Sequence, residues 1–153
     1  MRARSTGIGS SIHGERHWRT VGATGLWLAE AVADVDTSVV LLFALLHDAM
    51  RENDARDPEH GPRAAAFAVA LHEEGLLAVT DAQLDRLHHA CFEHADGTVS
   101  SDPTVGVCWD ADRLDLPRVG ITPRPDLFST EAARNGGHPA GEPPGWTELY
   151  GGR

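Results

Sequence analysis

Histidines recur along this chain at positions where a helix would bury apolar side chains. His17 lies four residues before Val21, and His60 lies four residues before Ala64. Because side chains four positions apart share one face of a helix, these imidazoles would point into the core. A single histidine in such a place is most often a hydrogen-bonded core residue, whereas several on different helices indicate a site.

Two carboxylates accompany these imidazoles. Asp48 follows His47 at the end of the most apolar segment, and Asp112 lies four residues after Cys108. Burying a carboxylate costs free energy unless it is paired or coordinates a metal, and imidazoles with carboxylates together suit a divalent cation. The predicted ligands are His17, His47, Asp48, His60, His94 and Asp112. This set has enough donors for one or two ions of Fe, Mn, Co, Mg or Zn.

Helices must position these residues. Apolar periodicity and capping residues predict five of them, over residues 15–32, 37–51, 60–75, 80–93 and 102–115, and we find no alternating strand pattern. The expected fold is all-α, a bundle of about five core helices with an irregular C-terminal tail. The domain would cover residues 11–134, between a flexible N-terminal arm at 1–10 and a glycine- and proline-rich tail at 135–153.

Composition excludes several functions. The net charge is −10 and all 13 basic residues are arginine, which argues against a nucleic-acid polymer as partner and excludes lysine Schiff-base and P-loop chemistry. Cys91 and Cys108 form no Cys-x-x-Cys pattern, so buried free thiols are expected. The longest apolar run is far shorter than the ~20 residues of a membrane-spanning helix. With no apolar leader at the N-terminus, we expect a cytoplasmic protein without a membrane partner.

The order of the six predicted ligands resembles that of the HD superfamily of metal-dependent phosphohydrolases. The segment HWRTV at 17–21 is similar to the opening motif, FALLHD at 43–48 to the namesake pair, and DADRLD at 110–115 to the closing motif. His60-Gly61, and His94 followed by Gly97, resemble the two middle histidines of the dinuclear branch. The resemblance spans residues 12–119.

This resemblance implies a metal-dependent phosphohydrolase that acts on a small phosphorylated metabolite or nucleotide through metal-activated water. Because all six ligand positions are filled, we expect an enzyme, with Asp48 as a catalytic ligand. Two alternatives stay open: a di-iron oxygenase of the same superfamily, and a non-catalytic domain that binds metal or a nucleotide for regulation. The substrate is not specified, and a homodimer is left open.

Further polar residues could assist the metal ligands. We expect Arg51 and Arg19 to take part in catalysis by binding phosphate oxygens bidentately. Asp110 could orient a ligand histidine, as carboxylates behind metal ligands commonly do. The candidates for orienting ligands or binding substrate are His13, His88, Arg63, Asp110 and Arg113.

Overall fold

The computed structural model describes residues 4–135, and the regular structure within them is entirely helical. The five long helices are α1 (Glu15–Ala29), α2 (Thr37–Leu46), α3 (His60–Glu73), α4 (Asp81–Glu93) and α5 (Pro103–Leu114). Three short ones follow: η2 (Leu116–Val119), η3 (Pro125–Leu127) and α6 (Glu131–Arg134). The prediction of an all-α fold is confirmed.

Side-chain caps fix where several of these helices begin. The Asp36 carboxylate accepts hydrogen bonds from the second and third backbone N–H groups of α2. Thr80 and Gln83 form the predicted capping box of α4, and Asp102 caps α5 ahead of Pro103. These caps satisfy backbone donors that a helix start would otherwise leave unpaired.

Two helices end earlier than predicted. Helix α1 stops at Ala29 rather than near residue 32, and the chain then turns through Asp34, which has a φ of 60°. Aspartate tolerates this left-handed conformation better than most residues. Helix α2 stops at Leu46 rather than near residue 51, because the backbone tightens into turns after His47. Asp48 therefore lies in a turn and not in a helix.

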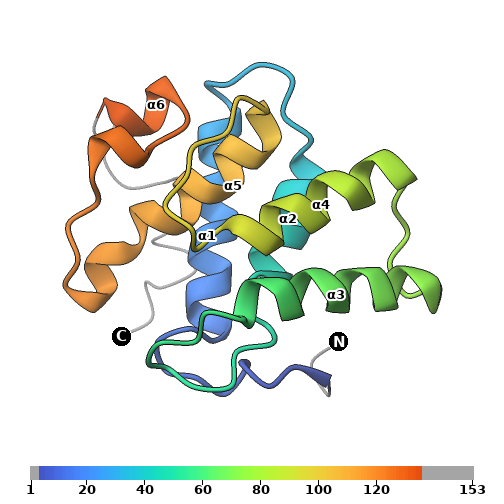
Figure 1. Cartoon of the computed structure of the whole chain (residues 1–153). Helices are drawn as coiled ribbons and strands as arrows, with labels where there is room; N and C mark the ends of the chain where they lie inside the picture. Colours follow the sequence, from blue (N-terminus) through green and yellow to red (C-terminus); the bar gives the residue numbers. More distant parts are fainter. Residues whose placement is uncertain (1–3, 136–153) are drawn as a thin grey trace.

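Helix α2 lies inside the bundle. It contacts α1, α3, α4 and α5, and its residues Val39, Val40 and Phe43 have no exposed surface. Figure 1 shows α3 and α4 side by side, with α5 crossing α1 and the short α6 at the upper left. Trp109 ties α5 to α4 by donating its indole N–H to the Ala90 carbonyl at 2.9 Å. The ends of several helices thus meet around the C-terminus of α2.

Glycine allows two close approaches between helices. A Cβ atom at Gly25 of α1 would lie 2.5 Å from Val40 Cγ1 of α2. One at Gly61 of α3 would lie 2.7 Å from the Phe92 carbonyl oxygen of α4. Since real Cβ atoms do not approach backbone oxygens so closely, Gly61 lets the start of α3 lie against the end of α4.

The chain ends were predicted to be an arm and a tail. In the described part of the arm, the Gly7 N–H and the Ser5 hydroxyl donate to the Ala49 carbonyl, and Arg4 pairs with Glu74. Residues from Arg4 onward therefore lie against the domain. The tail from residue 136 lies outside the described residues. No helix in the described part of the chain is long and apolar enough to cross a membrane.

Candidate metal centre

The end of α2 carries the two central residues of the site. His47 caps the helix at its C-terminus, and Asp48 follows in the turn. His47 is completely buried, and only 3% of the surface of Asp48 is exposed. An imidazole and a carboxylate are thereby placed together in the interior, where the other long helices meet α2.

One side of Asp48 faces His17 of α1 and His47. The Nε2 atoms of the two imidazoles are 3.1 Å apart, and each lies 3.7 Å from Asp48 Oδ2. Asp112 of α5 completes this side, with Oδ1 3.1 Å from His17 Nε2 and 3.7 Å from His47 Nε2. We call His17, His47 and Asp112 the closed set, because neither of its imidazoles lines the cavity described below.

The other side of Asp48 faces His60 and His94. Asp48 Oδ1 lies 3.3 Å from His60 Nε2 and 3.7 Å from His94 Nε2, and the two Nε2 atoms are 2.8 Å apart. His60 begins α3 and His94 caps α4, so the close approach at Gly61 brings them together. We call His60 and His94 the open set, because both line the cavity. Asp48 is shared between the sets through its two oxygens.

All four imidazoles place Nδ1 against a protein oxygen on the outer side of the site. The acceptors are Asp115 Oδ2 for His17 (2.7 Å), the Phe43 carbonyl for His47 (3.1 Å), the Asp57 carbonyl for His60 and the Cys91 carbonyl for His94 (2.7 Å). A carbonyl oxygen can only accept, so Nδ1 carries the proton in those rings and Nε2 keeps its lone pair. In their neutral forms, these three rings therefore direct their Nε2 lone pairs toward the carboxylates.

Converging acceptors of this kind repel one another unless a cation lies between them. Two ligand atoms at ~2.1 Å from one ion are roughly 3.0 Å apart at a right angle and 3.4 Å apart at a tetrahedral angle. The two Nε2–Nε2 separations, 3.1 and 2.8 Å, are close to these values. The donors are imidazole nitrogens and carboxylate oxygens, a combination that divalent metals accept. The buried groups His17, His47 and Asp48, and Asp48, His60 and His94, could each hold a metal ion.

Electrostatics keep the carboxylates charged. Burial would raise the pKa of Asp48, but the electrostatic interaction with the adjacent His47 imidazole and hydrogen bonds with His13 and His94 hold this pKa well below its usual value. Burial would also raise the pKa of Asp112. The hydrogen bond with His17 outweighs this effect, so the pKa of Asp112 is lowered. Both side chains are therefore available as anionic ligands.

The imidazoles differ from one another. Burial lowers the pKa of His47 to about 4 and also lowers the pKa of His60, so both rings are neutral at physiological pH. His17 is buried too, but its hydrogen bonds with Asp112 and Asp115 raise its pKa to about 9. In the open set, burial opposes protonation of His94, but its hydrogen bond with Asp48 raises its pKa as well. One imidazole in each set thus favours a proton, with which a metal ion would compete.

A cavity of about 320 Å³ opens beside the open set. Asp48, His60, His94 and Asp112 line it at the metal-ligand end. The rest of the wall includes His13, Arg51, Ala95, Gly97, Arg113, Leu116, Arg118, Pro123, Arg124 and Leu127. Its size suits a small molecule, and the arginines suit an anionic one.

Three of the predicted assisting residues lie at this cavity. His13 Nδ1 is 3.0 Å from Asp48 Oδ2, and Arg51 Nη1 is 3.4 Å from Asp48 Oδ1. Arg51 also donates to the carbonyls of Asn53 and Ala55. His13 and Arg51 therefore hold the shared carboxylate from two sides. Arg113 lines the wall further along.

Other predicted residues lie elsewhere. Arg19 is more than half exposed and pairs with Glu15, and it does not line the cavity. Arg63 forms a bidentate pair with Asp57 and so stabilises the loop whose carbonyl accepts from His60. Neither arginine is placed to bind a phosphate at the metal ligands.

The roles predicted for Asp110 and His88 also differ from their positions in the structure. The Asp110 carboxylate accepts hydrogen bonds from the Ser129 and Thr130 backbone and from the Thr130 hydroxyl, so it anchors the segment before α6. His88 stacks on Phe92 and does not line the cavity. Neither side chain orients a ligand histidine.

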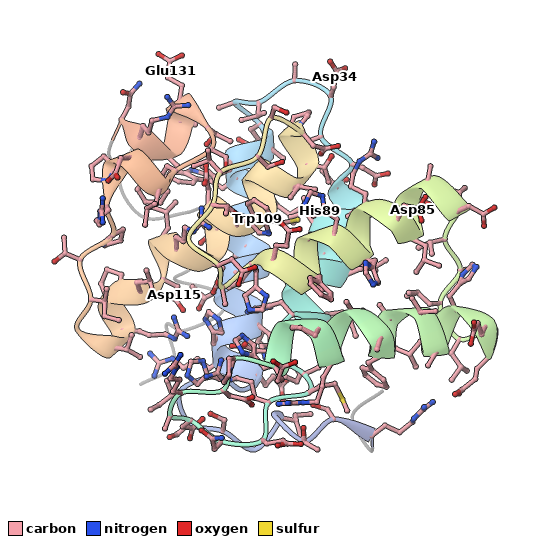
Figure 2. The ribbon with its side chains drawn as sticks, in the orientation of Figure 1. Asp34, Asp85, His89, Trp109, Asp115 and Glu131 are labelled. Carbon is pink, nitrogen blue, oxygen red and sulfur yellow. The ribbon has the colours of Figure 1, made fainter. Side chains whose placement is uncertain are left out.

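The carboxylate that contacts a candidate ligand imidazole, His17, is Asp115, which sequence reasoning missed. It follows Asp112 by three residues and caps α5, beside α1 (Figure 2). Spacing along α5 could have suggested it, since residues three apart share a face. Arg118 was missed as well. It lies in η2, which lacked a periodic pattern, and its Nη2 is 3.3 Å from His13 Nδ1.

Comparison of the chain with protein-family models, curated proteins and solved structures found no match.

Proposed function

We propose that this chain binds two divalent metal ions, one at each side of Asp48, and hydrolyses a small phosphate ester or nucleotide. The closed set and Asp48 would hold one ion, and the open set and Asp48 would hold the other. A cytoplasmic location remains part of the proposal.

The main support for two metal ions is the orientation of the four imidazoles. Four imidazoles keep their Nδ1 atoms against outer oxygens and turn their Nε2 atoms toward one buried carboxylate. A core histidine that served only packing would need a donor or acceptor on each nitrogen. Here the second partner of each ring is another imidazole or a shared carboxylate, which suits a bound cation.

The chemistry follows from what the side chains can do. When bound, divalent ions act as Lewis acids that polarise phosphoryl oxygens and acidify water. His13 and Arg51 keep the Asp48 carboxylate in place through contacts with its two oxygens. The arginines of the cavity wall offset the negative charge of a phosphate next to the carboxylates. The resemblance of the ligand order to the HD superfamily supports the same reaction.

A hydrolysis assay on metal-loaded protein tests the proposal. p-Nitrophenyl phosphate, bis(p-nitrophenyl) phosphate and the nucleoside monophosphates would each be incubated with wild type, with Asp112→Ala and with Asp85→Asn, whose side chain is exposed on α4. We expect wild type and Asp85→Asn to hydrolyse at least one substrate and Asp112→Ala to lose on the order of a hundredfold or more in rate.

Two results would count against hydrolysis. Equal rates in wild type and Asp112→Ala would mean that the activity does not come from this site. Oxygen consumption by iron-loaded protein, without release of phosphate by any metal form, would favour the oxygenase alternative.

A further inference from the structure

Part of the cavity wall consists of residues other than the candidate metal ligands. The C-terminal part of α5, η2 and the segment up to η3 form it, together with the loop after α4. Apolar side chains lie in this wall, among them Leu116, Pro123 and Leu127, and so does Arg113. A ligand that reaches the metal centre therefore also meets this wall.

Arg113 is held rigidly in this wall. Only 7% of its surface is exposed, and its guanidinium carbon lies 5.6 Å from the centre of the Trp109 ring. Its Nη1 donates to the Leu127 carbonyl. Its Nη2 is buried and has no hydrogen-bond partner among the described residues. A buried charged donor left without an acceptor is costly, so such a group in a native protein calls for an explanation, of which a bound ligand or ion is one.

No protein carboxylate forms an ion pair with this guanidinium in the described part of the chain. Asp110 accepts hydrogen bonds from Ser129 and Thr130, and Asp112 Oδ1 faces His17. Both nearby carboxylates on α5 are thus occupied elsewhere. An anion in the cavity that Arg113 lines would supply an acceptor for its Nη2.

Arg118 adds positive charge to the same wall. It donates to the carbonyls of Ile12 and Asp115, pairs with the Asp115 carboxylate and lies 3.3 Å from His13 Nδ1, so it is fixed on the side of the cavity near His17 and Asp48. The cavity wall thus carries two arginines, Arg113 and Arg118, together with apolar side chains.

We propose that the substrate carries a second anionic group, a carboxylate or a phosphate, on a short carbon skeleton, and that Arg113 binds this group. The ester phosphate lies at the metal ligands, the skeleton contacts Leu116 and Leu127, and the second anion accepts from Arg113 Nη2. This inference rests on the proposed function for the position of the first phosphate.

Paired ligand series test it by binding rather than by turnover. Straight-chain alkyl phosphates would be compared with phosphorylated hydroxy acids of equal chain length, from one to four methylenes. Dissociation constants would be measured by calorimetry on metal-loaded wild type, Arg113→Lys, Arg113→Gln and Arg56→Gln, whose side chain is exposed. Circular dichroism and metal content would be recorded for each variant.

We expect the carboxylate to tighten binding by roughly tenfold or more at one chain length in wild type and Arg56→Gln. Arg113→Lys keeps the charge but cannot serve Leu127 and the ligand together, so it should lose most of that gain while binding alkyl phosphates normally. If Arg113→Gln does not fold, the lysine variant still decides the test.

The outcomes separate the two proposals. A carboxylate that gives no gain at any length, or the same gain in Arg113→Lys, overturns this inference and leaves hydrolysis intact. Tight, Arg113-dependent binding of the phosphorylated acids without hydrolysis supports this inference and overturns the proposed reaction. Metal-loaded protein that binds neither series overturns both.

Discussion

The closed and open sets share Asp48 but differ in charge and in access. Asp112 brings a second carboxylate to the closed set, and the Asp115 carboxylate lies behind His17. In the open set, backbone carbonyls rather than carboxylates orient His60 and His94. Only the open set has imidazoles in the wall of the cavity.

This difference assigns the sets separate roles. Added negative charge strengthens the attraction for a cation, and a carboxylate behind a histidine makes its imidazole a better ligand. The closed set should therefore hold its ion tightly and keep it. The open set should bind more weakly, exchange its ion and meet the substrate, because it faces the cavity.

The largest expected effect comes from the residue that both sets share. Asp48→Asn removes the charge that lies between all four imidazoles, so affinity for both ions should fall on the order of a thousandfold. Elemental analysis after dialysis would show it, with Asp85→Asn as the matched control. Two retained equivalents of metal in Asp48→Asn would mean that Asp48 does not join the sets.

One variant in each set tests the expected difference in metal affinity between the closed and open sets. His60→Ala should lose the weaker ion and keep about one tight equivalent, whereas His17→Ala should weaken the tight ion by roughly a hundredfold. Calorimetric titration would resolve the two affinities, and His89→Ala, exposed on α4, is the control. Equal losses in both variants would contradict separate roles for the sets.

A smaller effect is expected behind the closed set. Asp115→Asn removes the carboxylate that accepts from His17 Nδ1. Metal affinity at the closed set should fall roughly 10- to 100-fold, as for other carboxylates behind ligand histidines. Competition with a chelator would measure this loss. An unchanged affinity would show that the Asp115 hydrogen bond contributes only to packing.

The pH dependence should be gradual. Despite burial, hydrogen bonds with Asp112 and Asp115 raise the pKa of His17 from 6.5 to about 9, so metal at the closed set displaces its proton. Affinity should then rise roughly tenfold per pH unit from ~6.5 to 8.5 and level off above about 9. A pH series of calorimetric titrations measures this slope, and a flat profile would contradict the protonation of His17.

The same shift affects the stability of metal-free protein. A raised pKa in the folded state means that the contribution of His17 is fully present below pH 6.5 and is lost as the pH rises through about 9. Metal-loaded protein should lack this loss, which thermal denaturation at pH 6.5 and 9 would detect.

Sequence alone predicted the helices, and it selected six candidate ligands that the structure brings together, for a physical reason. Apolar spacing identifies the buried face of each helix, so His17, His60 and His94 stood out as polar residues on such faces. The sequence argument expected Arg19 to bind phosphate, but Arg19 pairs with Glu15 one turn earlier on α1. Spacing alone does not show which of these partners an arginine side chain takes. Spacing places Asp115 on the face of Asp112 but does not give its contact with His17, and the position of Arg118 depends on where η2 lies in the tertiary structure.

Metal content of the purified wild-type protein tests the central claim most directly. The protein would be stripped with a chelator, reconstituted separately with Mn, Fe, Co and Zn, passed through a desalting column and analysed for metal per chain. We expect about two equivalents with at least one of these metals, one of them resistant to further dialysis. No bound metal under any of these conditions would contradict the account and leave the six residues as a buried hydrogen-bonded network.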